Sequence, residues 1–232
     1  MDIPKSDISI IIPALNEAKT LPTICESLID MGHEGQIIIV DGGSTDRTPQ
    51  LAASYGQLLY ANANRALQMN AGAKNAQGKI LWFLHADCIP HPNSVNAIQK
   101  VMANRNIVGG AFSYRMDAKG IIYRLSEFLS NEKNRLFRWF YGENGIFVRK
   151  TVFEALGGYR EIPIMEDIDF CLQLKKMGKV VILPQPILSS ARRWKSDGPI
   201  KNIIRNWLLQ IGWRLGISPQ LLVKFYPLNQ NQ

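Results

Sequence analysis

The first ninety residues alternate short apolar runs with segments of helical character, and this alternation limits the fold more than any other feature. The apolar runs cover residues 8–12, 36–40, 57–61 and 79–84. The segments between them show apolar residues at helical spacing, or open near a proline and close at a glycine. Such alternation is typical of a mostly parallel sheet with helices on both faces. We therefore predict an α/β fold, and 232 residues suffice for one domain with an appendage.

The second half of the chain is less regular but continues to mix strands and helices. We expect strands near 108–114, 146–148 and 179–183, and helices near 94–102, 121–140, 151–156 and 166–177. After Trp194 the composition shifts towards a helical tail. We therefore divide the chain into a domain over residues 1–195 and an amphipathic helical tail over residues 196–232.

Composition and charge narrow the class of protein. Hydrophobic residues make up 46% of the chain, and the net charge of +8 favours an anionic partner such as phosphates, nucleic acid or an acidic membrane surface. Nucleic acid is disfavoured because no binding module for it is recognisable. The cysteines (Cys25, Cys88 and Cys171) lack metal-ligand spacing, so we expect them to pack in the core of a cytoplasmic protein. The N-terminal residues do not resemble a signal peptide.

Acidic side chains stand at or just after the ends of three predicted strands, at Glu17, Asp41 and Asp87. Because the carboxyl ends of parallel strands meet at one edge of a sheet, we expect these acids on a common rim. Carboxylates there suit a divalent metal together with a sugar or nucleotide hydroxyl. The simpler interpretation of each acid is a turn or a helix cap. The motifs G-x-G-x-x-G and G-x-x-x-x-G-K-[ST] do not occur, which disfavours a dinucleotide dehydrogenase and a P-loop NTPase.

Four ordered segments resemble the signature of family 2 glycosyltransferases, which are inverting enzymes with the GT-A fold. The segments are 8–17, 40–46, 85–87 and Glu166-Asp167. Residues 64–72 and 190–194 are similar to a short bacterial subfamily often labelled arsenosugar-associated. The resemblance covers roughly residues 8–195. It implies a GT-A fold and transfer of a sugar from a nucleoside-diphosphate sugar, with uracil as the expected base, to an acceptor hydroxyl.

The resemblance also implies which residues form the site. Asp87 would hold Mn²⁺ or Mg²⁺, Asp167 would act as general base with support from Glu166, and Trp194 would stack on the acceptor. The residues expected to bind the nucleotide sugar are Pro13, Ala14, Glu17, Asp41, Ser44, Arg65, Ala86, Arg192 and Arg193. His85 departs from the family pattern, which has an acid there, so its role stays open between a hydrogen-bond donor and a structural residue.

Simpler interpretations compete with several of these assignments. Arg65 is also compatible with a solvated surface arginine, and Glu166-Asp167 with capping of a helix start, where acids are favoured. Two alternative functions also remain. One is a nucleotide-sugar-binding or recruitment protein of the same fold without turnover. The other is a nucleotidyltransferase, which would need a glycine-rich loop with Arg and Lys after the first strand, and that loop is missing.

Two amphipathic segments lie outside the expected nucleotide site. In the segment 121–140, apolar residues recur at helical spacing and predict core or interface packing, or contacts with an acceptor: Leu125, Phe128, Leu129, Leu136 and Phe140. In the tail, an apolar stripe with two tryptophans and several cations predicts a helix lying on an anionic membrane surface, or one packed on its own domain or in a dimer. The acceptor is expected to be a small molecule or to be lipid-linked.

Overall fold

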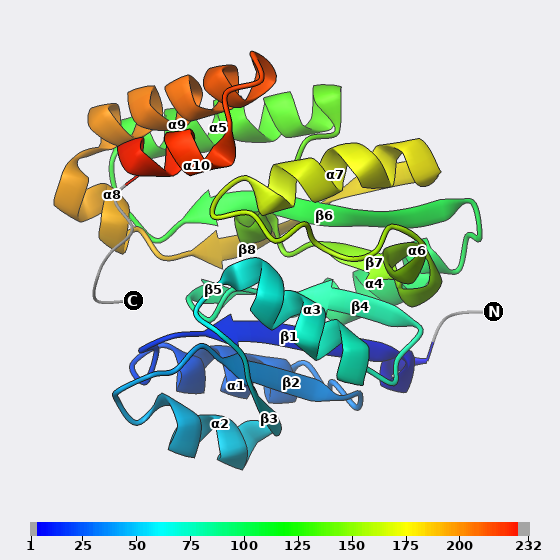
Figure 1. Ribbon diagram of the computed structural model, residues 1–232. Helices are drawn as coiled ribbons and strands as arrows, with labels where there is room; N and C mark the ends of the chain where they lie inside the picture. Colours follow the sequence, from blue (N-terminus) through cyan, green and yellow to red (C-terminus); the bar gives the residue numbers. More distant parts are fainter. Residues whose placement is uncertain (1–3, 227–232) are drawn as a thin grey trace.

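The computed structural model describes residues 4–226, apart from the side chains of Lys5 and Arg193. Within these residues, one eight-stranded sheet has the strand order β3-β2-β1-β4-β7-β6-β8-β5 (Figure 1). Strands β1 to β4 are parallel to one another, and β6 is parallel to β8. Strand β7 is antiparallel to β4 and β6, and β5 is antiparallel to β8. The predicted mostly parallel sheet is confirmed. The strands are β1 (Ile8–Ala14), β2 (Ile37–Asp41), β3 (Gln57–Tyr60), β4 (Ile80–Phe83), β5 (Cys88–Ile89), β6 (Ile107–Met116), β7 (Phe147–Arg149) and β8 (Lys179–Ser189).

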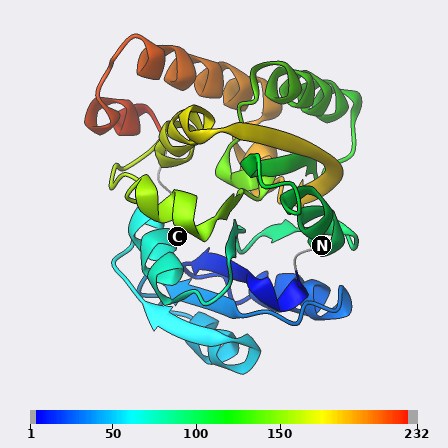
Figure 2. The same ribbon diagram turned by 90° about the vertical axis from the view of Figure 1, so that its right-hand side faces the viewer.

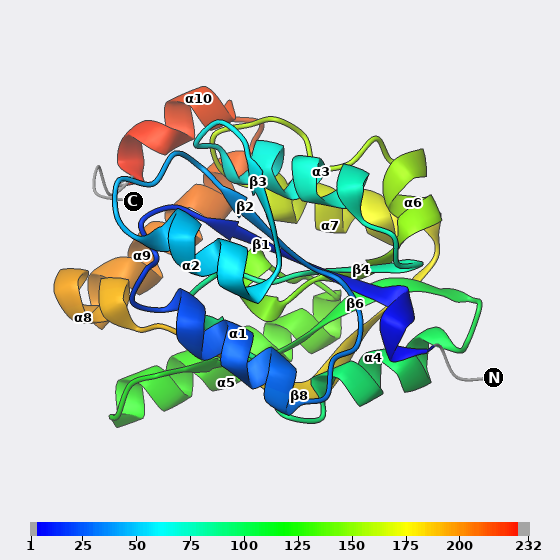
Figure 3. The same cartoon turned by 90° about the horizontal axis from the view of Figure 1, so that it is seen from below.

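Helices cover both faces of this sheet, as the sequence predicts (Figure 3). One face carries α1 (Leu21–Asp30), α2 (Thr48–Tyr55) and α4 (Ser94–Met102), and the other carries α3 (Arg65–Asn75), α6 (Lys150–Ala155) and α7 (Glu166–Met177). Successive side chains of a strand point to opposite faces, so Ile10 joins the first core and Ile11 the second. This burial on both sides explains why the strands read as continuous apolar runs. All three cysteines are free and buried, as expected.

A further layer of helices lies beyond β6 and β8. It consists of α5 (Ile121–Phe137), α8 (Arg192–Asp197), α9 (Pro199–Arg214) and α10 (Pro219–Leu222), with α5 and α9 side by side (Figures 1 and 2). On the edge of β6 that faces β7, Gly109 and Gly110 are the residues that pair with β7. The backbone N–H and C=O groups farther along that edge therefore need other partners. Helix α5 supplies them: Asn131 bonds both the N–H (2.8 Å) and the C=O (2.9 Å) of Tyr114.

Helix α5 thereby presents its polar side to the sheet, which corrects the expectation for its apolar side. Leu125, Phe128, Leu129 and Leu136 are exposed rather than packed in a core, and only Phe140, beyond the helix end, is buried. The tail packs on the domain through Leu209, which joins a small cluster with Ile164 and Leu222. Among the helices of residues 4–226, none has the length and apolar character needed to cross a membrane.

Lys133 of α5 provides a test of this layer through the pH dependence of stability. Burial, aided by the nearby Arg214, lowers the pKa of Lys133 from 10.5 to about 8. Between these pH values the unfolded chain binds the proton that the folded protein has lost, so the free energy of unfolding rises with pH. We expect this rise to be about 1–3 kcal/mol larger in the wild type than in Lys133→Met. Urea unfolding of both proteins at pH 7.5 and 10 measures it, and identical pH profiles would contradict the burial of the ammonium.

Candidate functional site

The loops after β1 and β2 are joined at the carboxyl edge of the sheet. Asp41 is 1% exposed, and its carboxylate accepts from the N–H groups of Gly43 and Ser44 (both 2.9 Å) and from Ser44 Oγ (2.5 Å). From the other loop, Asn16 N–H donates to Ser44 Oγ (2.8 Å), and its side-chain oxygen accepts from Thr45 N–H (2.8 Å). Asp41 and Ser44 therefore organise a shared loop, and their contacts with a nucleotide stay a prediction.

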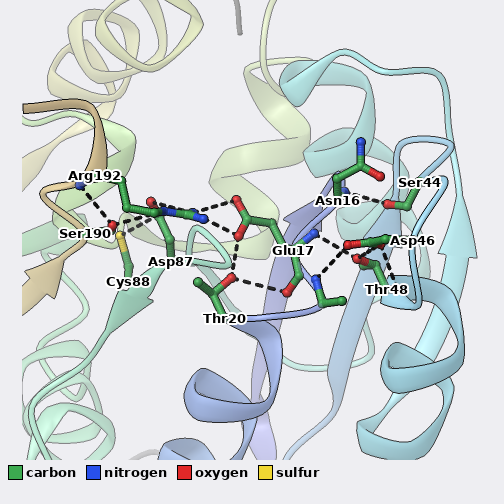
Figure 4. A network of polar contacts seen from close by, with 11 residues as sticks. Asn16, Glu17, Thr20, Ser44, Asp46, Thr48, Asp87, Cys88, Ser190 and Arg192 are labelled. Atoms are coloured by element: carbon green, nitrogen blue, oxygen red, sulfur yellow. Dashed lines mark hydrogen bonds and ion pairs between the residues drawn. The ribbon is translucent and has the colours of Figure 1, made fainter. Parts of the chain in front are cut away.

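Asp46 and Thr48 extend this network towards Glu17 (Figure 4). The carboxylate of Asp46 accepts from the N–H (2.9 Å) and hydroxyl (2.5 Å) of Thr48 and from Ala18 N–H (3.2 Å). Desolvation alone would raise the pKa of Asp46, but these hydrogen bonds hold it below its ordinary value. Glu17 N–H donates to the Thr48 hydroxyl (2.8 Å), which fixes the start of the Glu17 side chain at the rim. The sequence motif contained Asp46, but its role was not predicted.

Glu17 and Asp87 converge on one cation, the guanidinium of Arg192 (Figure 4). Arg192 Nη2 lies 3.1 and 3.0 Å from the two Glu17 oxygens and 3.6 Å from Asp87 Oδ2. Thr20 also donates to the Glu17 carboxylate. The three groups come from the β1–α1 loop, the turn before β5 and the start of α8. The structure thus brings together three of the predicted site residues, two acids and one arginine.

The residues around Asp87 fit a divalent metal that binds through oxygen. His85, Asp87 and Cys88 each offer a ligand atom, and these atoms lie within 4.8 Å of one another. Burial, together with the Asp87 charge, raises the pKa of Cys88 well above its ordinary value. Mn²⁺ and Mg²⁺ prefer oxygen ligands to sulfur, so the Cys88 thiol is a poor match for them. Mn²⁺ and Mg²⁺ use one or two carboxylates together with phosphate oxygens and water. Asp87, whose carboxylate is paired with Arg192, provides such a carboxylate.

Gly142 connects the Asp87 turn to Asp167. Its N–H donates to Asp167 Oδ2 (2.8 Å), and a Cβ at position 142 would come within 2.3 Å of His85 Nε2. His85 and Asp167 therefore both lie next to this one glycine, although they are 82 positions apart in the sequence. The predicted metal ligand and the predicted base are thus parts of one site. Gly142 was missed at the sequence level, where the only signal was a Gly-Glu-Asn-Gly run before β7.

Arg65 and Glu166 form a second ion pair at this site. Arg65 lies at the start of α3 and Glu166 at the start of α7, and Arg65 Nη1 lies 3.0 Å from Glu166 Oε1. Glu166 is 3% exposed, and its burial raises the pKa of the carboxyl even though Arg65 opposes the shift. Glu166 therefore anchors α3 to α7, next to Asp167. The contact of Arg65 with a phosphate stays a prediction.

Tyr114 and Glu143 are further residues of the site that the sequence did not indicate. The hydroxyl of Tyr114 is buried, and within residues 4–226 it has no hydrogen-bond partner. Burial and then the charge of Glu143 raise the pKa of Tyr114, so this side chain remains a neutral hydrogen-bond donor. The charge of Asp87 adds to the same rise in the pKa of Tyr114.

The remaining predicted residues are less directly placed. The Ala14 carbonyl accepts from Gly42 N–H (2.8 Å) and from Gln68 Nε2 (2.9 Å) at the end of β1. Ala86 packs in the core, and Trp194 packs against a small hydrophobic cluster that includes Tyr114. Pro13 is buried in β1. The side chain of Arg193 lies outside the described part of the chain. Binding roles for all five stay predictions.

The contact between Gly142 and His85 gives a direct test of this geometry. We expect Gly142→Ala to lower the free energy of unfolding by about 1–3 kcal/mol, because the added methyl group overlaps the imidazole. The double variant His85→Ala/Gly142→Ala has no imidazole for the methyl group to overlap. Its free energy of unfolding should therefore lie close to that of His85→Ala alone. Urea unfolding of the four proteins measures the coupling. Additive losses would mean that the two residues are not in contact.

Comparison with known proteins identifies the family. The model of "Glycosyl transferase family 2" matches residues 9–156, which is more than half of the chain. A beta-monoglucosyldiacylglycerol synthase from Synechocystis is 25% identical over 210 residues, covering 79% of this chain and 43% of the relative. An undecaprenyl-phosphate 4-deoxy-4-formamido-L-arabinose transferase from Pectobacterium carotovorum is 29% identical over 126 residues, covering 48% of this chain and 38% of the relative. The chain thus spans less than half the length of these curated relatives.

Solved structures agree on the fold. The mannosyltransferase PcManGT from Pyrobaculum calidifontis, in complex with GDP-Man and Mn²⁺, superposes with a TM-score of 0.65 at 18% identity, covering 79% of this chain and 56% of that one. S. aureus TarS 1-349 in complex with UDP-GlcNAc has a TM-score of 0.64 at 15% identity, covering 80% of this chain and 58% of that one. These neighbours have the GT-A fold, as the sequence predicted. The chain therefore belongs to glycosyl transferase family 2.

Proposed function

We propose that the protein transfers a sugar from a nucleoside-diphosphate sugar to an acceptor hydroxyl by a metal-assisted single displacement with inversion. The observation that supports this most strongly is the convergence of the two halves of the site. The acids Glu17 and Asp87 meet at Arg192, and Asp167 is tied to the same region through Gly142 and His85. Displacement at an anomeric carbon needs a stabilised leaving group on one side and a base on the other.

The donor side of the proposal rests on Glu17, Asp87 and two arginines. Arg192 and Arg65 are the cations closest to the acids of the site, and each is placed to turn from its carboxylate to a diphosphate. Mn²⁺ or Mg²⁺ bound at Asp87 would neutralise charge on the departing diphosphate. The structural neighbours were solved with GDP-Man and Mn²⁺ and with UDP-GlcNAc, which supports a nucleotide-sugar donor of this class. Uracil as the base remains part of the proposal.

On the acceptor side, Asp167 is held for proton transfer. Its Oδ2 accepts from Gly142 N–H (2.8 Å) and its Oδ1 from Ile168 N–H (2.7 Å), so the carboxylate is oriented by backbone donors. A carboxylate oxygen can accept more than one hydrogen bond, so each retains capacity for the acceptor hydroxyl. In the proposed reaction Asp167 takes that proton as the oxygen attacks the anomeric carbon. The product then has the opposite anomeric configuration to the donor.

We further propose a lipid-borne acceptor. Two relatives are named for lipids, one as a beta-monoglucosyldiacylglycerol synthase and the other as an undecaprenyl-phosphate 4-deoxy-4-formamido-L-arabinose transferase. The cytoplasmic location and the division of the chain at residue 195 remain parts of this proposal.

Thermal-shift measurements with UDP, GDP, dTDP and CDP, each with and without Mn²⁺, test the donor proposal. We expect one nucleoside diphosphate to raise the melting temperature, and to do so more strongly with Mn²⁺. No shift with any of the four would count against a nucleotide-sugar site. A shift without any turnover of the matching nucleotide sugars in the presence of membrane lipids would favour a binding protein of the same fold.

A further inference from the structure

Helices α5 and α9 have the reverse of the usual orientation for helices on a protein surface. An amphipathic helix normally buries its apolar side and exposes its polar side. In α5 the buried side chains are Glu127 and Asn134, while Phe128 is 60% exposed and Leu136 is 76% exposed. Glu127 accepts from Met116 N–H (2.6 Å) on β6, so its burial is enforced by the sheet edge.

Helix α9 shows the same reversal in part: it buries Leu209 but exposes an apolar stripe. It directs Asn202 and Gln210 inward, where Asn202 donates to the Gly198 carbonyl (2.8 Å) and Gln210 accepts from the Tyr141 hydroxyl (2.8 Å). The exposed apolar side chains of this helix, and of Leu215 directly after it, recur at helical spacing: Ile200, Ile204, Trp207, Leu208, Ile211 and Leu215. Trp207 is 59% exposed.

The two exposed sides form one surface. Helices α5 and α9 lie side by side at the end of the molecule opposite β3, in both views (Figures 1 and 2). We call this surface the α5/α9 face; it consists of the six α9 residues above with Ile121, Leu125, Phe128, Leu129, Leu136 and Phe137 of α5. Next to it, α9 and α10 border a hollow of about 770 Å³ that is lined mainly by apolar side chains, such as Leu208 and Phe225, together with Lys201 and Arg205. Contiguous apolar surfaces of this kind mark contacts with proteins or membranes.

Charge decides between a bilayer and a second copy of the chain. In residues 192–226, Lys195, Lys201, Arg214 and Lys224 are exposed, whereas Arg192 and Arg205 are paired with acids; on α5 the exposed Glu132 is paired with Arg135, and the whole chain has a net charge of +8. Two copies meeting through this face would bring two strongly positive regions together, which is unfavourable. An anionic bilayer instead attracts the cations, accepts the apolar side chains, and suits tryptophan at its interface.

We propose that the α5/α9 face docks on an anionic lipid bilayer. Docking would leave the sheet above the membrane and place the candidate site next to it. Tyr141, which contacts α9 through Gln210, directly precedes Gly142, and Gly142 donates to Asp167. If the proposed transfer reaction is correct, the acceptor is then a hydroxyl presented at the bilayer surface, and docking supplies it to the base side of the site.

Vesicle sedimentation of the full chain tests the proposal. With vesicles of equimolar phosphatidylglycerol and phosphatidylcholine, we expect the wild type to partition to the lipid, and to do so much less with phosphatidylcholine alone or at high salt. Phe128→Ser/Leu129→Ser on α5 and Trp207→Ser/Leu208→Ser on α9 should each lower partitioning at least about tenfold. Lys201→Gln should lower it about fivefold. The control Ile29→Ser/Tyr60→Ser removes equally exposed side chains from α1 and β3 and should leave it unchanged.

Two results would overturn the proposal. One is equal partitioning of the wild type and the α5/α9 variants. The other is a wild-type dimer in analytical ultracentrifugation that these variants convert to monomers without any lipid binding, which would make a second copy the partner. Melting temperatures of all variants exclude unfolding as the cause. Nucleotide binding is measured on the same proteins. Lipid docking without nucleotide binding would reject the proposed transfer reaction but not the docking. Nucleotide binding without lipid docking would reject the docking but not the transfer reaction.

Discussion

Replacement of Asp167 by Asn is expected to lower the rate of sugar transfer about 10²- to 10⁴-fold while nucleotide binding stays intact. The amide preserves the shape of the side chain and can still accept from Gly142 N–H through its oxygen, so the loop should keep its position. It cannot take a proton from the acceptor hydroxyl, and a positioned base is worth this factor in rate. Initial rates with a saturating donor, together with calorimetric titration of the nucleoside diphosphate, separate the two effects.

Asp169→Asn is the matched control for this experiment. Asp169 belongs to the same first turn of α7, but its carboxylate is engaged by Gln173 Nε2 (2.6 Å) and by Arg160 (3.6 Å). We expect this variant to transfer sugar at close to the wild-type rate. If Asp167→Asn were equally active, the base would have to be sought elsewhere, and Glu143 would be the next candidate because its charge acts on Tyr114 and Arg65 within the site.

Asp87→Asn is expected to remove the metal dependence of donor binding and to lower the transfer rate at least about 10²-fold. A neutral amide is a weak ligand for Mn²⁺ or Mg²⁺, and a metal ion contributes several kcal/mol to stabilising charge on a departing phosphate. The Glu17–Arg192 ion pair remains in this variant, because Arg192 lies closer to Glu17 than to Asp87. Donor affinity measured across a range of Mn²⁺ concentrations gives the result.

The control for Asp87 is Asp30→Asn, an exposed acid at the end of α1. It removes the same charge from the protein without touching the site, so the Mn²⁺ dependence should be unchanged. A wild-type response to Mn²⁺ in Asp87→Asn would exclude Asp87 as the ligand.

The first half of the fold was predictable because its strands are buried on both faces. Runs such as Ile8–Ile12 fill two cores at once, and a short β-branched run of this kind is typical of a strand buried on both faces. The second half was harder because its signals are short or interrupted. Strand β5 has two residues. Strand β8 was expected to end near Leu183, but it continues through Pro184 and Pro186 to Ser189, helped by a register shift against β6 between Phe112 and Ser113.

The orientation of α5 shows a further limit of periodicity. The spacing of Leu125, Phe128 and Leu129 reveals an apolar stripe but not which way it faces. In this protein the uncovered edge of β6 takes the polar side, through Glu127 and Asn131, and the apolar side is left outward. Core packing is excluded for these side chains for this reason, whereas interface packing and contact with an acceptor stay predictions.

The candidate site was predictable only as separate residues. Strand-end position singled out Glu17, Asp41 and Asp87, and the family resemblance added Asp167. The sequence did not reveal that Arg192 bridges Glu17 and Asp87, since Arg192 lies 175 positions after Glu17 in the chain. The contact depends on where β8 ends relative to the carboxyl edge of the sheet. Gly142 was equally hidden, since its role is to leave room for His85.

The central claim, inverting transfer by a metal-assisted site with Asp167 as base, is tested most directly by the configuration of the product. The measurement is ¹H NMR of the anomeric proton while the protein, an α-linked nucleotide sugar, Mn²⁺ and membrane lipid react. The account predicts a β-linked product from the wild type, with little product from Asp167→Asn or without metal. An α-linked product, or equal turnover by Asp167→Asn, would contradict it.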